Sequence, residues 1–249
     1  MIGIVGGVGP FAGLDIFKKI IEETIATKDQ EHLPVLLSSQ PNRIADRTAF
    51  LKGKELENPG DSLLKIILEL ENAGANVAAI PCNTAHAPAI FDKIKIGLSQ
   101  SSSEIKLLHL VEETAKFIQS AYPNKIVGIL STTGTRDTGL YKSTLSNFHI
   151  ESISPADDIQ NMVHDAIYNV EYGIKAQSSP VNEKAKENLL HAIQNLKNQG
   201  AHIIVLACTE LPLALEEKEY FGLPTIDPNR ILARALINSV APQKLKSII

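Results

Sequence analysis

The sequence predicts an α/β fold made of two pseudo-symmetric, doubly wound parallel-sheet domains, with the active site between them. An internal repeat is the first observation, because residues 74–82 and 200–208 both run Gly-Ala, an apolar stretch and then Cys. A second repeat pairs Gly3-Ile4 with Gly128-Ile129, at nearly the same offset along the chain. The third observation is that strand-like and helix-like segments alternate, which is typical of parallel sheets covered by helices.

The first half alternates regularly between strands and helices. We expect a buried strand at residues 2–5, a second short strand at residues 34–39 and a third strand that ends at Cys82. Helices are expected over residues 11–21, 61–73 and 84–93, with Gly74 ending the second one. A glycine-rich turn at residues 6–10 joins the first strand to the first helix, and the polar stretch 40–60 is predicted to be a loop.

The second half repeats this alternation. Strands are expected at residues 107–110, 125–130 and 224–226, with another that ends at Cys208. Helices are expected around Leu140 and over residues 111–122, 157–171, 181–198, 211–217 and 229–240. The serine-rich stretch 99–104 is the predicted hinge between the halves. The predicted domains are therefore residues 1–104 with 224–249, which carry Cys82, and residues 105–223, which carry Cys208.

Composition excludes several classes of protein. The chain has 24 basic and 28 acidic residues and a formal charge of −4, without a dense basic run, so neither nucleic acid nor an anionic membrane is an expected partner. No apolar stretch reaches about 18 residues, and the N-terminus lacks the features of a signal peptide. Two cysteines do not make a disulfide framework, so we expect a cytoplasmic protein with reduced thiols.

The two cysteines are candidate acid/base catalysts. Ligands of parallel sheets bind beyond the carboxyl ends of the strands, where both Cys82 and Cys208 are expected. Polar residues follow each of them and are predicted to start helices, which would lower a thiol pKa from its usual value of about 8.5. Two thiols on opposite faces of one carbon could invert an amino acid by removing a proton from one side and returning it on the other. The alternatives are inert core packing, a disulfide or a metal pair, but no CxxC motif or histidine cluster supports the last two.

These residues carry a resemblance to the aspartate/glutamate racemase family. Ile4-Val5-Gly6-Gly7-Val8-Gly9-Pro10 is similar to the family's N-terminal glycine turn, with Val8 where Met is commoner. Residues 81–86 resemble its first catalytic motif, and residues 207–213 resemble its second, with Ala207 where Gly is usual. Residues 129–135 also resemble the family, so the likeness covers essentially the whole chain.

The resemblance implies a cofactor-independent amino-acid racemase that acts on aspartate or glutamate and forms homodimers. It implies that Cys82 and Cys208 are the two catalytic residues. No metal is expected, because the sequence has no CxxC motif and no clustered histidines. Arg47 and Lys175 match segments that supply positive charge for a dicarboxylic substrate. The full set of implied substrate-binding residues is Gly7, Val8, Gly9, Arg47, Asn83, Thr84, Thr133, Lys175, Thr209 and Glu210.

Other functions remain open at this point. Maleate isomerase, hydantoin racemase and arylmalonate decarboxylase resemble the same scaffold, and a two-lobed anion-binding protein would need no matched thiols. Gly7, Gly9 and Ala12 fit a loose dinucleotide-binding fingerprint, but the second strand ends in Ser39-Gln40 without the acid that holds a ribose. No feature marks a lysine that would bind pyridoxal phosphate. Arg47, Lys175 and Glu210 could instead be a loop cation, a surface lysine and a helix cap.

Overall fold

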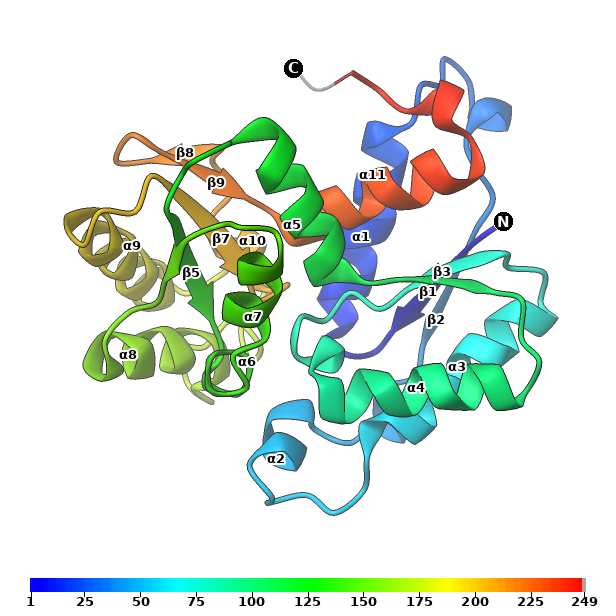
Figure 1. The fold of residues 1–249 in the computed structure, drawn as a ribbon, viewed down its shortest axis with the longest axis horizontal. Coiled ribbons are helices and arrows are strands. Elements are labelled where there is room, and N and C mark those ends of the chain that lie inside the picture. The colour runs from blue at the N-terminus through cyan, green and yellow to red at the C-terminus, as the bar shows by residue number, and fades with distance from the viewer. Residues whose placement is uncertain (248–249) are drawn as a thin grey trace. The chain divides into compact units, whose positions relative to one another are not determined.

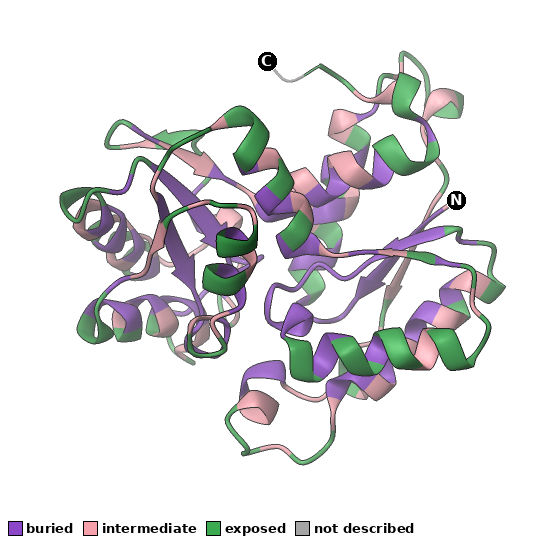
Figure 2. Ribbon diagram, in the orientation of Figure 1, coloured by how far each residue is buried: buried purple, intermediate pink, exposed green. Residues whose placement is uncertain are grey.

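A computed structural model of the chain describes residues 1–247. The chain forms two compact units (Figure 1). Residues 1–113 and 229–247 form the first unit, and Thr114–Pro228 form the second. Each unit contains its own sheet, and the strands at the centre of each sheet are buried (Figure 2). The two-domain α/β class predicted from the alternating pattern is confirmed.

Four parallel strands form the sheet of the first unit, in the order β2-β1-β3-β4. They are β1 (Ile2–Gly6), β2 (Val35–Ser39), β3 (Val77–Ala79) and β4 (Lys106–Leu108). Strand β1 is central and fully buried, whereas β2 lies at an edge and is only partly buried. The apolar run at residues 2–5, predicted to be a buried strand, therefore lies where both faces of the sheet are covered.

Helices cover both faces of this sheet. Helices α3 (Pro59–Asn72) and α4 (Pro88–Gln100) pack against each other and share one apolar core with β1 and β3. Helices α1 (Pro10–Glu23) and α11 (Pro228–Val240) lie together on the other side (Figure 1). Short helical turns complete the unit at Asp29–Glu31, Pro41–Arg43 and Pro242–Lys244.

The second unit has a five-stranded sheet in the order β6-β5-β7-β9-β8. Its strands are β5 (Val127–Ser131), β6 (Ser152–Ile153), β7 (Ile203–Ala207), β8 (Glu219–Tyr220) and β9 (Leu223–Ile226). All neighbours are parallel except β8 and β9, which form an antiparallel hairpin. The two-residue strands β6 and β8 were not predicted, because segments this short have no measurable hydrophobic period.

Helices α8 (Asp157–Tyr168) and α9 (Glu183–Asn198) pack against β5 and enclose the main core of the second unit. The unit also contains α6 (Thr133–Asp137), α7 (Leu140–Asn147) and α10 (Leu211–Ala214). Helix α5 (Leu110–Ala121) runs across the division between the units, and its C-terminal half contacts the segment after α7 through Gln119, whose Nε2 donates to the Phe148 carbonyl at 3.0 Å.

The internal repeat has a physical basis in how a helix joins its strand. Gly74 and Gly200 end α3 and α9 with the same φ of 98°, which a residue with a side chain rarely adopts. The next residues, Ala75 and Ala201, each donate a backbone N–H five residues back along the helix, at 3.0 Å in both units. These bonds close a Schellman motif at both helix ends. The repeated Gly-Ala pair is therefore a helix stop that feeds the strand leading to each cysteine.

Strand order extends the repeat to the whole sheet. β1, β2, β3 and β4 occupy the same relative places in the first sheet as β5, β6, β7 and β9 in the second. Gly3 on β1 and Gly128 on β5 are equivalent, because a Cβ at either one would press on the alanine after the helix stop, at 3.1 Å in both units. Both glycines let a helix end lie close against the central strand.

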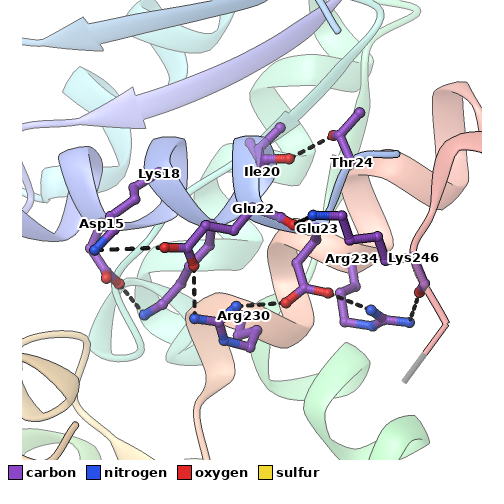
Figure 3. A network of polar contacts seen from close by, with 10 residues as sticks. Asp15, Lys18, Ile20, Glu22, Glu23, Thr24, Arg230, Arg234 and Lys246 are labelled. Carbon is purple, nitrogen blue, oxygen red and sulfur yellow. Dashed lines mark hydrogen bonds and ion pairs between the residues drawn. The ribbon is translucent and has the colours of Figure 1, made fainter. Parts of the chain in front are cut away.

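Charged side chains attach the C-terminal helix α11 to α1 within the first unit (Figure 3). Glu23 accepts bonds from Arg230, at 2.6 Å, and from Arg234. Arg230 also donates to Glu22 at 3.0 Å, and the Thr24 hydroxyl donates to the carbonyl of Ile20. The two arginines thereby hold the last helix on the unit in which the chain began.

Two predictions about chain organisation differ from the structure. Residues 99–104, the predicted hinge, lie inside the first unit, because β4 follows them and pairs with β3. Residues 224–226, assigned to the first domain, belong to β9 and pair with β7 in the second unit. The serine-rich composition of residues 99–104 did not mark the hinge, because the chain still adds β4 to the first sheet before it enters the second unit within α5.

The stretch 40–60, predicted to be a loop, contains the helix α2 (Arg47–Leu51). Asp46 caps it, since its carboxylate accepts the Ala49 N–H at 2.7 Å. The five-residue helix is too short to show an amphipathic period. Among residues 1–247, no helix is both long and apolar enough to span a bilayer.

Candidate active site

The glycine turn and Arg47 form one cluster at the carboxyl edge of the first sheet. A Cβ on Gly7, whose φ is 83°, would lie 2.7 Å from the backbone nitrogen of Pro41, so only glycine fits there. Arg47 is 8% exposed and donates from Nη2 to the Val8 carbonyl at 2.7 Å and from Nη1 to the Ala45 carbonyl at 3.3 Å. The structure thus brings together Arg47 and the turn Gly7–Gly9, although 39 residues separate Arg47 from Val8.

Cys82 lies at the same edge, because β3, three residues before it, pairs with β1. Its side chain is 7% exposed, and Asn83 and Thr84 are buried beside it. The predicted helix start differs in detail, since a three-residue turn, η3 (Thr84–His86), comes first and α4 begins only at Pro88. Proline disfavours helical geometry in the residue before it, so Ala87 is extended and the two helical segments are separate.

His86 holds the segment that carries Cys82. Its Nδ1 lies 2.9 Å from the Cys82 carbonyl, and its Nε2 accepts the Leu110 N–H at 3.2 Å. This pair of contacts requires the neutral ring with its proton on Nδ1. Burial, together with repulsion from His109, lowers the pKa of His86 to about 3. The histidine is therefore uncharged at neutral pH and acts as a fixed link between Cys82 and the start of α5.

Four predicted residues of the second unit form what we call the Cys208 cluster, which consists of Lys175, Cys208, Thr209 and Glu210. The Cys208 thiol donates to Glu210 Oε2 at 3.1 Å, and the Thr209 hydroxyl reaches the same oxygen at 3.4 Å. The other oxygen, Oε1, pairs with the ammonium of Lys175. These three partners of the carboxylate are residues that the sequence had singled out.

Burial and charge set the protonation of this cluster. Burial raises the pKa of the Cys208 thiol, and the Glu210 carboxylate raises it further, while Lys175 opposes both. Burial alone would lower the pKa of Lys175, but attraction from the Glu210 carboxylate outweighs it, so that the pKa of Lys175 lies above its ordinary value. Near neutral pH the cluster therefore holds a thiol, a carboxylate and an ammonium.

The predicted lowering of the Cys208 pKa by a helix start is wrong. Glu210, and not Thr209, is the N-cap of α10, and that helix has only four residues. So short a helix sums few peptide dipoles, and the adjacent carboxylate opposes ionisation of the thiol directly.

Thr133 lies at the same edge of the second sheet, since β5 and β7 pair through Ser131 and Ala207. Its hydroxyl is 3.4 Å from Nδ1 of His164, whose ring stacks on Tyr168 at 4.9 Å between centroids. The Lys175 ammonium lies 5.5 Å from the centre of the Tyr168 ring. Sequence analysis did not select His164 or Tyr168, although their spacing of four residues on α8 places both on one helix face.

The glycine turn and Cys82 belong to one unit, and Thr133 and the Cys208 cluster belong to the other. Within residues 1–247, no three His, Cys, Asp or Glu side chains are gathered closely enough to hold a metal ion. Each unit therefore places one thiol and one cation at the carboxyl edge of its sheet, Cys82 and Arg47 in the first unit and Cys208 and Lys175 in the second. This content matches acid/base chemistry at carbon.

Comparison with known proteins agrees with this chemistry. The sequence pattern of the Asp/Glu/Hydantoin racemase family matches residues 5–236. The chain belongs to this family. It is 28% identical over 247 residues to the broad specificity amino-acid racemase RacX of Bacillus subtilis (strain 168), covering 96% of this chain and 97% of RacX. The family resemblance and the prediction of an enzyme of the aspartate/glutamate racemase type are confirmed.

Solved structures of the family share the fold. The aspartate racemase of Picrophilus torridus is 28% identical with a TM-score of 0.81, over 98% of this chain and 95% of that chain. A glutamate racemase of Francisella tularensis in complex with D-glutamate is 14% identical with a TM-score of 0.66, over 100% of this chain and 84% of that chain. The racemase fold is thus kept across a wide range of sequence identity.

Proposed function

We propose that this racemase interconverts the enantiomers of aspartate or glutamate without a cofactor, by proton transfer between Cys82 and Cys208. One thiolate removes the α-proton, which breaks the C–H bond and forms an S–H bond. The opposite thiol then gives its proton to the other face of the carbanion. The carrying observation is that each thiol follows a strand that occupies the same place in its sheet, β3 in one unit and β7 in the other.

The charges within each unit favour a dicarboxylic substrate. Arg47 supplies a guanidinium beside the glycine turn, and Lys175 supplies an ammonium beside Cys208. We propose that these cations take the two carboxylates, with Asn83, Thr84, Thr133 and Thr209 lining the amino-acid end. An ammonium has three donors, so Lys175 can keep its bond to Glu210 while it binds a substrate oxygen.

A broad amino-acid range is the second candidate, because the family member RacX carries that description. Arg47 distinguishes the two candidates. If its charge binds the side-chain carboxylate, Arg47→Met should lose activity on aspartate and keep activity on neutral amino acids. Hydantoin racemase and maleate isomerase activity, and a purely anion-binding role, are tested in the same panel.

The test is a panel of D- and L-amino acids, hydantoins and maleate, incubated with the enzyme in D₂O and followed by NMR for deuterium at the α-carbon and for isomerisation of maleate. We expect incorporation into aspartate or glutamate, and a loss of at least about 10²-fold in Cys82→Ala and in Cys208→Ala, the lower end of what a positioned acid or base contributes. Full activity in either variant would rule out the two-thiol mechanism. Incorporation into hydantoins alone would exclude the dicarboxylic substrate.

We further propose a cytoplasmic homodimer, in which the reducing compartment keeps both thiols free. The residues described contain two free cysteines, one in each unit. Light scattering coupled to size-exclusion chromatography gives the mass, and an elution at 27.0 kDa would exclude the dimer.

A further inference from the structure

The two halves of the repeat differ at the second residue after the cysteine. The first half reads Cys82-Asn83-Thr84, and the second reads Cys208-Thr209-Glu210. A neutral hydroxyl therefore stands in one half where the other half has a carboxylate. The strands that lead to the two thiols are equivalent, so the two halves differ here in the side chains beside the thiols and not in the order of the strands.

The carboxylate of Glu210 is held directly against the Cys208 thiol. It is 4% exposed, and its Oε2 accepts the Cys208 thiol at 3.1 Å. Its Oε1 pairs with Lys175, so a cation compensates the buried carboxylate and keeps it ionised. A carboxylate held in this way accepts a hydrogen bond from a thiol and repels a thiolate.

Cys82 has a different environment. His86 bonds to its backbone carbonyl and not to its sulfur. Among the described residues of the first unit, no carboxylate bonds to Cys82 Sγ. The two thiols are therefore chemically inequivalent before any substrate binds.

Other ionisable groups face Cys208 from the elements around it. Lys175, in the segment after α8, lowers the thiol pKa, whereas Glu210 raises it. Tyr141 on α7 interacts with Cys208. Burial raises the pKa of Tyr141 well above the ordinary value, a hydrogen bond with Thr114 opposes this rise, and negative charge on Cys208 or Asp227 would add to it. Tyr141 is thus neutral, so Glu210 and Lys175 are the charges that decide the state of the thiol.

We propose that Glu210 is a positioning residue that holds Cys208 as the protonated thiol of the resting enzyme, so that Cys82 removes the first α-proton. This assignment rests on the proposed two-thiol function. In the first half-reaction the α C–H bond breaks and an S–H bond forms at Cys82. The S–H bond of Cys208 then breaks as its proton goes to the opposite face of the carbon. The enzyme starts in the form that accepts one enantiomer.

The test uses the fact that the chain has only two cysteines. Cys82→Ala leaves Cys208 as the sole thiol, and its alkylation by iodoacetamide is followed by mass spectrometry as a function of pH. The midpoint of this profile reports ionisation, while the plateau rate at high pH reports access. We expect the folded midpoint to lie above that of the same variant in denaturant.

Two further changes should move the midpoint in opposite directions. Adding Glu210→Gln keeps the shape but removes the negative charge, and should raise the alkylation rate near neutral pH by about tenfold, as a shift of roughly one pKa unit implies. Adding Lys175→Met should lower that rate by a similar factor. General loosening of the fold would change both variants in the same direction, so opposite shifts identify the charges as the cause.

The matched control is Cys208→Ala with and without Glu210→Gln, in which the Cys82 profile should stay the same. The proposal is overturned if Glu210→Gln leaves the Cys208 midpoint unchanged or raises it, or if Cys82 shifts equally. Alkylation does not require turnover. Failure of the two-thiol function would instead appear as racemisation that persists in Cys82→Ala or Cys208→Ala.

Discussion

At the scale of single residues, buried polar groups decide how this protein responds to pH. His86 is 1% exposed, and both ring nitrogens are bonded to backbone groups. The ring of His86 stacks on the ring of Phe91, with 5.0 Å between their centroids, and meets the ring of His109 edge-on, with 4.6 Å between centroids. Charging His86 would place a cation in this enclosed site and remove the acceptor that Leu110 requires.

We therefore predict a loss of stability in mild acid that depends on His86. Its pKa is lowered to about 3 in the folded protein, so the unfolded chain binds a proton first as the pH falls below the ordinary histidine range. The neutral, buried His86 therefore contributes to the free energy of unfolding. Its contribution is complete above the ordinary histidine range and decreases by about 2 kcal/mol on going to pH 5. Urea titrations at pH 7 and pH 5 measure it.

In the variant His86→Asn this part of the pH dependence should disappear, even though the variant is less stable at both values. The exposed His191 provides the control, since His191→Asn should keep the wild-type dependence. Equal pH dependence in wild type and His86→Asn would show that the buried ring does not carry the effect.

At the scale of elements, the junction between a helix end and a central strand is the repeated unit of construction. In the second unit, a Cβ at Gly128 would lie 2.7 Å from Ile204 Cδ1 and 3.2 Å from Leu196 Cδ1. These side chains belong to β7 and α9, and both are fully buried. Space for the helix end is thus provided by the missing side chain on β5.

We predict that Gly128→Ala lowers the free energy of unfolding by about 1–3 kcal/mol, the usual cost of overpacking a closed core. Combining it with Ile204→Val removes the methyl group that the new Cβ meets and should recover part of the loss. Urea denaturation of the two variants measures this recovery. Strictly additive losses would show that the clash with Ile204 is not the cause.

At the scale of the whole molecule, the chain leaves its first unit in α5 and returns to it at α11. The returning helix is held by buried apolar residues, among them Leu232 and Leu236, and by the contacts of Glu23. Burial tends to raise the pKa of Glu23, but bonds from Arg230 and Arg234 outweigh it and the pKa is lowered. The carboxylate therefore stabilises the folded state.

We predict that Glu23→Gln destabilises the protein by about 1–3 kcal/mol near neutral pH, the range for hydrogen bonds to charged groups. The difference from wild type should narrow as the pH falls through the lowered pKa of Glu23, because protonation then removes the same charge. Lys18→Gln is the control. Its pair with Glu22 is exposed and 3.6 Å long, so the change should cost less than about 1 kcal/mol. Equal losses in the two variants would contradict the prediction.

Much of the fold could be predicted because its signals are local. Apolar runs marked the central strands, helical spacing marked α1 and α3, and Gly74 marked the end of α3. The division between the units was misplaced because pairing of β4 with β3, and of β9 with β7, is set by contacts distant in sequence. Short elements such as α2 and β6 leave no period to detect.

In the candidate site, too, some residues could be predicted from local sequence signals, whereas the contacts between them could not. Cys82 and Cys208 stand out in sequence because a repeat places each after an apolar strand. The bond between Lys175 and Glu210, 35 residues apart, has no signal in sequence spacing, and neither has the bond between Arg47 and Val8. The contacts that Lys175 and Arg47 make with these partners are therefore visible only in the folded structure.

The sequence by itself determined the fold class, the duplication and the family, because these depend on local patterns and on motifs that need no spatial context. Tertiary structure alone decided the state of the Cys208 thiol, which the sequence predicted with the wrong sign. The reason is that ionisation in a buried site follows from desolvation and from charges brought close by folding. A helix start beside the cysteine was visible in the sequence, but the buried carboxylate bonded to its sulfur was not.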